Sequence, residues 1–395
     1  MAFLNSKRLI VYPRILLVLY AVVAGYWIVG GLIPGHAPVD LLGKPIGSDF
    51  LQFWTASNLV LASKAQVVYE PNLFYAAQQE VAGVFFPLPW HYPPNFLLIV
   101  LPLAFLPYLL SLLLWTLTTL VLYAVTVRFL APHPYTLMLT LAFPATFQNL
   151  IHGQNGFLSA AFLGGGLALI DRHPIAAGIL FGLLTYKPHL AVLLPVVLIA
   201  GRYWRSLTAM ALTTAILTAV SSIMFGKTIW ILFLRNIFFA TSLLTSGALP
   251  SFRVPSVFAA TLLAGGTAMT ATIAQAAVGL MVCTLVVFIW SRPQAPFFVK
   301  ASTLSVAVVM VTPHIFEYDL TILAIPLAYL AINASKAGRC TLTEQIILSL
   351  AWVSPLIISP IAKVTSLQLG PCFFAALLVI TLGHFKRISK SASTA

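Results

Sequence analysis

The stretch Tyr108–Leu130, YLLSLLLWTLTTLVLYAVTVRFL, indicates the class of fold, because it is long and apolar enough to cross a membrane as a helix. Its only charged residue is Arg128, close to its C-terminal end. Backbone N–H and C=O groups cannot stay unpaired in hydrocarbon, so a block of this kind must be helical. Similar blocks recur along the whole chain, which predicts an all-α polytopic membrane protein.

The composition agrees with that class. Of 395 residues, 60% are hydrophobic and 7% are Asp, Glu, Lys or Arg, whereas about 25% are charged in a typical soluble protein. The charge is too sparse to cover a water-facing surface, so we expect a single membrane-embedded domain over residues 1–395. The three cysteines, Cys283, Cys340 and Cys372, lie far apart and show neither metal-ligand spacing nor a disulfide framework.

The net charge of +13 does not indicate nucleic-acid binding. A nucleic-acid surface gathers its basic residues into a patch or stripe with interleaved aromatics. Here Lys and Arg stand singly or in pairs between apolar blocks, where flanking charges set the topology of the chain. We therefore expect membrane lipids as partners, and no nucleic acid.

The apolar blocks predict about twelve transmembrane helices in one bundle. The first, residues 14–33, is too long for the core of a signal peptide, so we expect it to be kept as an anchor. Residues 95–106 are few enough for a partial or re-entrant helix. Residues 174–200 are interrupted by Lys187-Pro188, where proline breaks the hydrogen-bond ladder, and we predict two short helices that meet at the outer face. The remaining blocks are residues 108–130, 135–151, 156–170, 207–225, 269–290, 297–311, 320–334, 342–361 and 371–384.

The charges that flank these blocks predict that both termini are cytoplasmic. Lys7, Arg8 and Arg14 precede or begin the first span, which places the N-terminus inside by the positive-inside rule. Residues 34–94 then form the first outer loop, with amphipathic pieces such as residues 50–62 expected along the outer interface. In this topology most of the 21 basic residues lie inside, and seven lie outside: Lys44, Lys64, Lys187, Lys227, Arg235, Arg253 and Lys363.

Titratable groups gather on the outer face of this topology. Asp171 and Glu344 fall in cytoplasmic turns, and the other six of the eight acidic residues are outside: Asp40, Asp49, Glu70, Glu80, Glu317 and Asp319. His91, His152, His189 and His314 lie there as well. Polar groups at membrane depth are costly and are therefore functional candidates. For Asp40, Glu70 and Glu80 an ordinary place in a loop is the better explanation.

Asp49 is the candidate general base. It lies in Gly47-Ser48-Asp49-Phe50, directly before an aromatic-rich helix that is expected to exclude water from the carboxylate. Loss of water raises the proton affinity of a carboxylate and suits it to accept a proton. An Asp helix cap is the alternative, and the local sequence leaves both open.

Two polar junctions between apolar blocks are candidate substrate contacts. His91-Tyr92-Pro93-Pro94 has a double proline that forces an extended entry into the next helix and holds Tyr92 and His91 at the membrane surface. His152-Gly153-Gln154-Asn155-Gly156 combines glycines, which allow close approach of a ligand, with amides that can bind sugar hydroxyls. A plain helix-to-helix turn needs the glycines but not Gln154.

Lys187, in Tyr186-Lys187-Pro188-His189, needs an anionic partner or a cavity because an apolar block surrounds it. A phosphate is a natural partner for such an ammonium beside helix ends. Snorkelling to the interface is the alternative. Thr312–Asp319 gathers His314, Glu317 and Asp319; an i,i+2 pair of carboxylates is a weak signal for a divalent ion, and orientation of substrate or of His314 is favoured.

The order of these motifs resembles glycosyltransferase family 87: Gly-Ser-Asp-Phe, Tyr69, Tyr-Pro-Pro, Gly-Gln-Asn, Lys187-Pro and a late Pro-His. The resemblance is clearest over residues 47–207 and weaker over 312–325. The family includes polyprenyl-phosphate-mannose-dependent mannosyltransferases of the GT-C fold. It implies a GT-C-like bundle that takes a sugar from a lipid phosphate at the non-cytoplasmic face. Asp49 matches the first-loop aspartate that such enzymes use as general base, and His314 falls near a late active-site histidine.

The expected activity is therefore inverting transfer of a sugar, mannose or another hexose or pentose, from a polyprenyl-phosphate donor to a lipid-linked or polysaccharide acceptor. Many GT-C enzymes carry a paired acidic motif with a metal, whereas Asp49 is alone, so we expect no metal and no cofactor. The expected donor-phosphate contacts are Lys187, His91 and Arg253, with help from His314, and the expected substrate contacts are Tyr92, Gln154, Asn155, His189, Glu317 and Asp319. We expect a bacterial inner membrane, with the active site facing the periplasm.

Two other functions remain open from the sequence. A transporter or flippase for lipid-linked glycans needs matched broken helices in two halves of the chain. Here both breaks, near Gly153 and Pro188, lie in one half. A glycan ligase shares the lipid-linked donor, but a large outer loop is expected in its later half, and residues 226–255 are modest by comparison.

Overall fold

The computed structural model describes residues 6–32, 38–247, 249–336 and 340–393, and in these ranges the chain is built from helices joined by short loops. The only β pairing among the described residues is a single antiparallel bridge between Val39 and Pro45. The predicted all-α class is therefore confirmed. The end of the first predicted span at Ile33, and residues 34–37 of the predicted first outer loop, lie outside the described residues.

The helices of the first half have the following bounds, with η marking a 3₁₀ helix: α1 Ser6–Leu32, α2 Phe50–Leu61, η1 Ala65–Tyr69, α3 Pro71–Ala82, α4 Pro94–Val100, η2 Leu101–Phe105, α5 Tyr108–Leu130, α6 Thr136–Leu141, α7 Pro144–His152, α8 Gly156–Leu169, α9 Pro174–Leu183, η3 Leu184–Tyr186, α10 Pro188–Ala191 and α11 Leu193–Ala200. Those of the second half are α12 Trp204–Phe225, α13 Thr228–Asn236, α14 Phe239–Thr245, η4 Ser251–Arg253, α15 Val257–Leu263, α16 Ala268–Trp290, α17 Phe297–Val311, η5 Glu317–Leu323, α18 Ala324–Lys336, α19 Leu342–Thr365 and α20 Gly370–Ser393.

Five of the described helices are long and apolar enough to cross a membrane, namely α5, α12, α16, α19 and α20. Six further apolar helical segments have only 10–17 residues. The chain is therefore an integral membrane protein, but the predicted count of about twelve spans is not confirmed. Prolines explain part of the difference: residues 135–151 divide into α6 and α7 because Pro144 starts a new helix.

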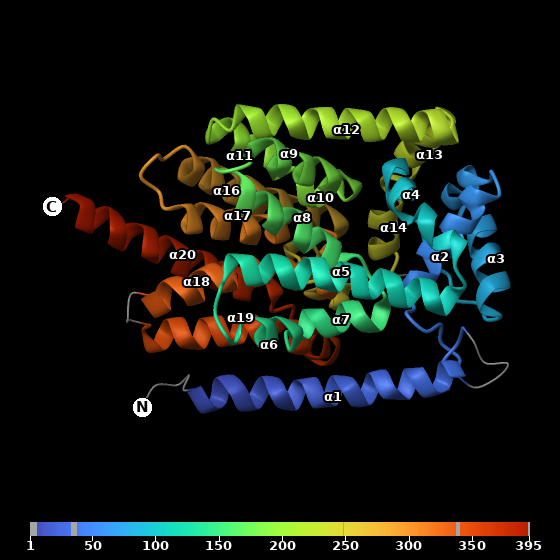
Figure 1. Ribbon diagram of the computed structural model, residues 1–395, viewed down its shortest axis with the longest axis horizontal. Coiled ribbons are helices and arrows are strands. Elements are labelled where there is room, and N and C mark those ends of the chain that lie inside the picture. Colours follow the sequence, from blue (N-terminus) through green and yellow to red (C-terminus); the bar gives the residue numbers. More distant parts are fainter. Residues whose placement is uncertain (1–5, 33–37, 248, 337–339, 394–395) are drawn as a thin grey trace.

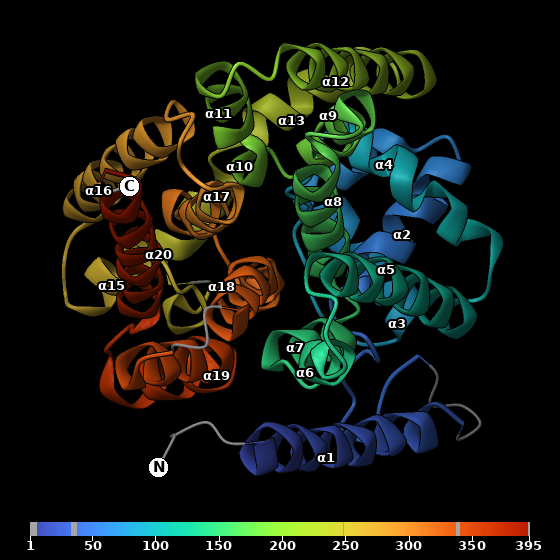
Figure 2. The same ribbon diagram turned by 60° about the vertical axis from the view of Figure 1, so that its left-hand side comes forward.

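The long helices run roughly parallel in one body (Figure 1). Helix α12 lies along one side, where it packs against α9 and α4, and α1 lies along the opposite side (Figures 1 and 2). Between them, α5 packs on α8, and α17 packs on α16, α18 and α20. Both termini lie at one end of the body, and α2, α3 and α4 lie at the other (Figure 1).

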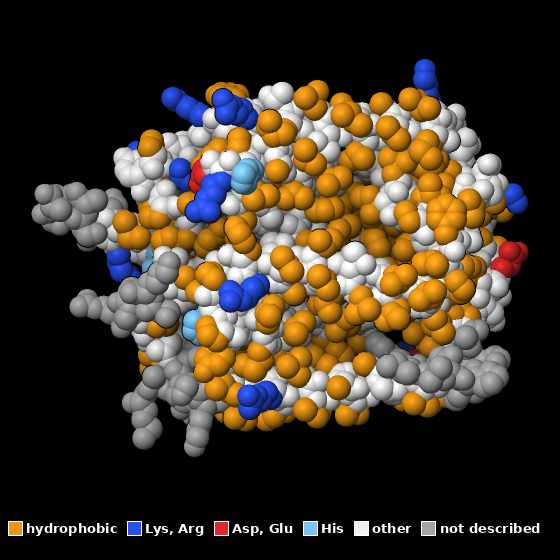
Figure 3. Space-filling view, viewed as in Figure 1, with side chains coloured by type: hydrophobic (Ala, Val, Ile, Leu, Met, Phe, Trp, Pro, Cys, Tyr) orange, Lys and Arg blue, Asp and Glu red, His pale blue; other side chains and the backbone are white. Residues whose placement is uncertain are grey.

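Charge is distributed unevenly between these two ends. On the face shown in Figure 3, most Lys and Arg side chains lie toward the end that carries both termini, and the middle is largely apolar. A bias of this kind is what the positive-inside rule predicts for a chain with cytoplasmic termini.

The predicted amphipathic, interfacial character of residues 50–62 is not confirmed. In α2, residues on all sides of the first two turns are buried, including Phe50 and Phe53 at 0% exposure. The Phe53 ring lies at the centre of an aromatic cluster with Trp90, Tyr92, Phe96 and Trp115. A helix with aromatic and aliphatic side chains around its whole circumference packs inside protein and does not float on a surface.

The predicted break at Lys187-Pro188 is confirmed. Helix α9 ends in the short η3, Lys187 leaves the helical region with φ −120° and ψ 81°, and Pro188 starts α10. A glycine near the end of α9 allows α12 to approach: a Cβ on Gly182 would lie 2.5 Å from the Cβ of Thr213. The irregular backbone at Tyr186-Lys187 is buried in the protein, as expected for non-helical backbone in a membrane protein.

Candidate functional site

Asp49 directly precedes α2, but its side chain does not cap that helix. Its carboxylate instead faces the α7–α8 junction, where Oδ2 accepts a hydrogen bond of 3.0 Å from Gln154 Nε2. Oδ1 accepts one of 3.4 Å from Ser48 Oγ. The Asp49 backbone N–H donates to the carbonyl oxygen of His152 at 3.0 Å. The helix-cap alternative is therefore excluded. The carboxylate instead accepts hydrogen bonds from the side chains of Ser48 and Gln154.

Gly153 makes this contact between the first loop and the α7–α8 junction possible. It adopts the left-handed conformation with φ +59°, and a Cβ at this position would lie 2.7 Å from the Phe50 Cβ. Only glycine adopts this conformation without strain while allowing so close an approach. The turn that ends α7 can therefore press against the start of α2 and bring His152 and Gln154 to Asp49.

A chain of polar side chains continues from Asp49 across three segments of the sequence. His152 Nδ1 lies 2.7 Å from Ser48 Oγ and 4.0 Å from Asp49 Oδ1. His152 Nε2 lies 3.2 Å from Arg253 Nη2. Arg253 Nε in turn donates to Glu317 Oε2 at 3.3 Å. From the sequence, His152 was only one of several outer-face candidates without a specific role, and Ser48 had none; the position of His152 beside the Gly153 turn was the available signal.

Lys187 is paired with Asp319. Its Nζ is 2.5 Å from Asp319 Oδ1, with only 3% and 2% of the two side chains exposed. The ring centroid of Tyr318 lies 5.3 Å from the same ammonium. Snorkelling does not fit so buried a side chain. The charge of Asp49 also acts on Lys187, so the carboxylate and the ammonium share one region. A phosphate-binding role for Lys187 stays a prediction, because Asp319 already compensates its charge.

Both carboxylates of the Thr312–Asp319 motif are engaged by cations, Glu317 by Arg253 and Asp319 by Lys187. Burial raises the pKa of Glu317, and Arg253 opposes that shift. Across residues 6–32, 38–247, 249–336 and 340–393, no group of three or more His, Cys, Asp or Glu side chains is arranged to hold a metal ion.

Three histidines from separate segments come together beside this network. Lys187, His314 and His91 all act electrostatically on His189. Burial lowers the pKa of His91 to about 4, helped by His314, and burial lowers the pKa of His314 to about 4. The His91 side chain is exposed. In its neutral form, each of these rings has one N–H donor and one acceptor nitrogen.

Tyr92 connects these groups to the aromatic cluster. Its hydroxyl lies beside the amides of Asn155 and Gln154 and within the influence of Asp319 and Asp49. Its ring packs against Phe96 with centroids 4.5 Å apart. Hydrogen bonds, ion pairs or electrostatic influence link the eleven residues predicted from the sequence, which come from segments on both sides of the Lys187 break: Asp49, His91, Tyr92, Gln154, Asn155, Lys187, His189, Arg253, His314, Glu317 and Asp319.

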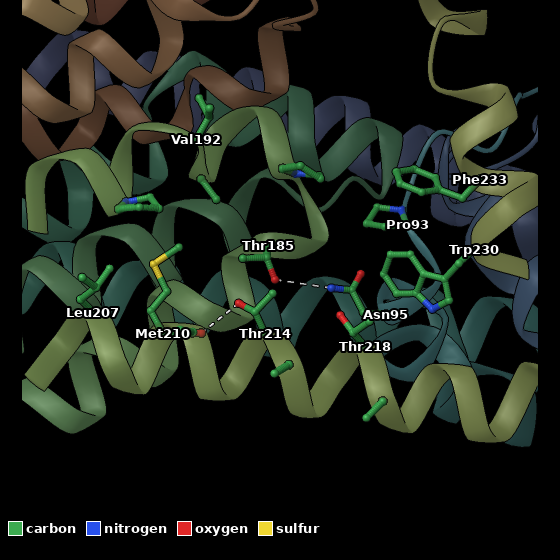
Figure 4. Close-up of a pocket in the computed structure, with 16 residues that line it drawn as sticks. Pro93, Asn95, Thr185, Val192, Leu207, Met210, Thr214, Thr218, Trp230 and Phe233 are labelled. Carbon is green, nitrogen blue, oxygen red and sulfur yellow. Dashed lines mark hydrogen bonds between the residues drawn. The ribbon is translucent and has the colours of Figure 1, made fainter. Parts of the chain in front are cut away.

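An apolar groove of about 870 Å³ adjoins this site between α12 and the α9–α11 segment (Figure 4). The α12 wall carries small side chains, including Ala211, Ala215 and Ala219. Trp230 and Phe233 of α13 close one end (Figure 4). The other lining residues are Pro93, Asn95, Thr185, Pro188, Ala191, Val192, Pro195, Leu207, Met210, Thr214 and Thr218.

The groove meets the polar site at the helix break. Asn95 Nδ2 donates to Thr185 Oγ1 across the groove wall at 3.4 Å (Figure 4). Thr185 and Pro188, which both line the groove, flank Tyr186 and Lys187, which are buried on the side of the site. The groove and the polar site are therefore neighbours at this helix break, on opposite sides of the Tyr186-Lys187 segment.

Comparison with known proteins gives one match. The family model described as glycosyltransferase family 87 matches residues 90–313, more than half of the chain. The matched region contains His91, His152, Lys187 and Arg253, whereas Asp49 and His314 lie outside it. No curated protein and no solved structure matches the chain.

Proposed function

Because the chain belongs to glycosyltransferase family 87, and is thus a membrane-embedded glycosyltransferase, we propose that it transfers a sugar from a polyprenyl-phosphate donor to a hydroxyl of a lipid-linked or polysaccharide acceptor. The sugar is mannose or another hexose or pentose, and transfer takes place at the non-cytoplasmic face of a bacterial inner membrane. The observation that supports the proposal is the apolar groove, whose lining residues Thr185 and Pro188 flank Lys187, a residue on which the charge of Asp49 acts.

The groove supports a lipid-linked donor rather than a soluble sugar nucleotide. Its walls are almost entirely apolar, and it runs along α12, a helix that is apolar and largely exposed over its length. An isoprenoid tail stays in an apolar environment when it moves from lipid into such a groove. A nucleotide in the groove would leave its polar groups without hydrogen-bond partners. The tail would place its phosphate near the helix break, close to the histidines and Arg253.

The chemistry at Asp49 is a single displacement. The carboxylate accepts the proton of the acceptor hydroxyl while the oxygen bonds to the anomeric carbon of the sugar. The bond between that carbon and the phosphate oxygen breaks, the polyprenyl phosphate leaves with the electron pair, and the anomeric configuration inverts. Asp49 is 16% exposed in its side chain, which leaves room for a hydroxyl beside the hydrogen bonds it already accepts.

The leaving phosphate needs cations or N–H donors that strengthen their contacts as charge develops. Arg253 is the most accessible cation of the network, with 31% of its side chain exposed. His91 and His314 supply N–H groups as well. Lys187 and Asp319 form a buried ion pair in the site. A contact from Lys187 to the phosphate would be made in addition to this pair and would not replace it.

The test is a transfer assay with purified protein and a panel of polyprenyl-phosphate sugars. Asp49→Asn keeps the shape of the side chain but removes the base, and we expect transfer to fall by about 10²- to 10⁴-fold. Donor binding and thermal stability should stay close to those of the wild type. Substantial residual turnover in this variant would remove Asp49 from its role, and movement of donor across the bilayer without transfer would favour a flippase.

A further inference from the structure

The hydrogen bonds between Arg253 and Asp49 have only one consistent direction. A guanidinium has donors and no acceptor, so Arg253 Nη2–H must donate to His152 Nε2, which is therefore unprotonated. A neutral imidazole then carries its proton on Nδ1, which donates to Ser48 Oγ at 2.7 Å. The Ser48 hydroxyl proton is left to donate to Asp49 Oδ1.

We propose that Arg253, His152 and Ser48 form a positioning relay that holds the Asp49 carboxylate aimed at the acceptor hydroxyl. This inference rests on the proposed role of Asp49 as general base, and it assigns functions to two residues, Ser48 and His152, that touch Asp49 but not the reacting atoms. Every proton in the relay points toward the carboxylate. Together with Gln154, it supplies donors to both carboxylate oxygens.

The relay also connects Asp49 to residues from the second half of the sequence. Arg253 lies in η4, after the α13–α14 segment, and contacts Glu317 of the late motif as well as His152. A ligand phosphate that engages Arg253 therefore contacts the group that sets the tautomer of His152. Donor binding and orientation of the base are linked through one side chain.

The surrounding charges favour the neutral form of His152 that the relay requires. Burial lowers the pKa of His152, Arg253 and Lys44 lower it further, and Asp49 opposes them. A protonated His152 ring would carry a hydrogen on Nε2. This hydrogen would face the N–H of Arg253 Nη2, and Arg253 would lose its acceptor. The other groups that act on Asp49 or on its neighbours are Lys187, Glu317, Tyr92, Tyr108 and Tyr318.

Two substitutions of His152 separate the two halves of the relay. In His152→Asn the amide nitrogen lies near the position of Nδ1 and still donates to Ser48, but the side chain is too short for Arg253. In His152→Gln the amide oxygen reaches toward Arg253, but the donor to Ser48 is lost. We expect His152→Asn to keep more of the wild-type kcat than His152→Gln.

Ser48→Ala removes the last donor of the relay. We expect kcat to fall by about tenfold to a hundredfold, the usual effect of losing a hydrogen bond to a charged group. The acid limb of the kcat–pH profile should move to higher pH in Ser48→Ala and in His152→Gln, because the carboxylate then holds a proton more tightly. His133→Asn is the matched control, since His133 is exposed on another loop, and its profile should match the wild type. Equal activity of the two His152 variants, with unmoved pH profiles, would overturn the relay.

A measurement that needs no activity separates this inference from the proposed function. In ¹⁵N-histidine-labelled protein, the resonances that disappear in His152→Asn should show a protonated Nδ1 and a bare Nε2. Arg253→Gln should shift the same ring toward the other tautomer. If that tautomer is found and the wild type transfers sugar from no donor, the proposed function fails and the relay geometry stands. If the wild type is active and His152 carries its proton on Nε2, the relay fails alone.

Discussion

Lys187 and Asp319 form a buried ion pair, and its two possible roles predict different behaviour. The side chains are 3% and 2% exposed, and Asp319 Oδ2 also accepts the Phe316 backbone N–H at 3.4 Å. Removal of one partner from such a pair leaves an uncompensated charge, whereas removal of both charges is often nearly neutral. The pair can therefore be a structural latch between the α9–α10 break and η5, or a phosphate contact that Asp319 holds in place.

Lys187→Met should destabilise the protein by about 3–5 kcal/mol, because Asp319 loses its counter-charge. The double variant Lys187→Met/Asp319→Asn should recover most of the thermal stability and keep an acceptor for Phe316. We expect transfer to stay low in the double variant, since the ammonium that approaches the donor phosphate is gone. Full recovery of both stability and transfer would mean that Lys187 is a latch only. Thermal melts and the transfer assay on the same preparations decide between these outcomes.

The residues of the site were predicted from the sequence to different degrees. Asp49 and Lys187 stood out because a charge among apolar residues is rare and must have a reason. The partner of Lys187 could not be assigned, since Asp319 lies 132 residues away and the pairing depends on how η5 packs against the break. Ser48 and His152 received no role because a serine and a helix-end histidine are ordinary in a loop. Only the geometry shows that each one donates toward the next.

Helix type and position were easier to predict than the burial of each helix. Residues 108–130 and 297–311 were predicted with the bounds that the structure has, because hydrophobic length alone defines them. Helix α2 was placed on the interface, and its burial in the aromatic cluster depends on side chains from the Trp90 and Trp115 segments that only the fold brings together. The predicted count of about twelve spans is not confirmed for a related reason: several apolar segments form helices of only 10–17 residues.

Helix α12 offers a direct test of the lipid-tail groove. Ala215 lines the groove, and the large side chain in Ala215→Trp should fill part of it. We expect KM to rise for a donor with a long polyprenyl chain and to stay unchanged for a donor with one or two isoprene units, because only the long tail needs the groove. Ile216→Trp is the matched control, since Ile216 is 60% exposed and does not line the groove. An equal effect of Ala215→Trp on both donors would contradict a tail in this groove.

Helix α2, which follows Asp49, lies at the end of the molecule opposite to both termini (Figure 1), and the proposed topology predicts that this end faces the non-cytoplasmic side. Helix α8 begins beside the Asp49 site at Gly156 and leads away from it toward Arg172. Lys64 lies just after α2, in the first loop. Both side chains are exposed, so each can report the side of the membrane that it faces.

In a variant that lacks Cys283, Cys340 and Cys372, single cysteines at Lys64 and Arg172 can be probed with a membrane-impermeant maleimide. We expect Lys64→Cys to react in intact spheroplasts, and Arg172→Cys to react only after the membrane is permeabilised, because flanking positive charge keeps the Arg172 end inside. Both variants must retain transfer activity, which shows that the labelled protein is folded. The reverse pattern would put Asp49 in the cytoplasm, where soluble nucleotide sugars compete as donors, and the need for a lipid-linked sugar would then have to come from the groove alone.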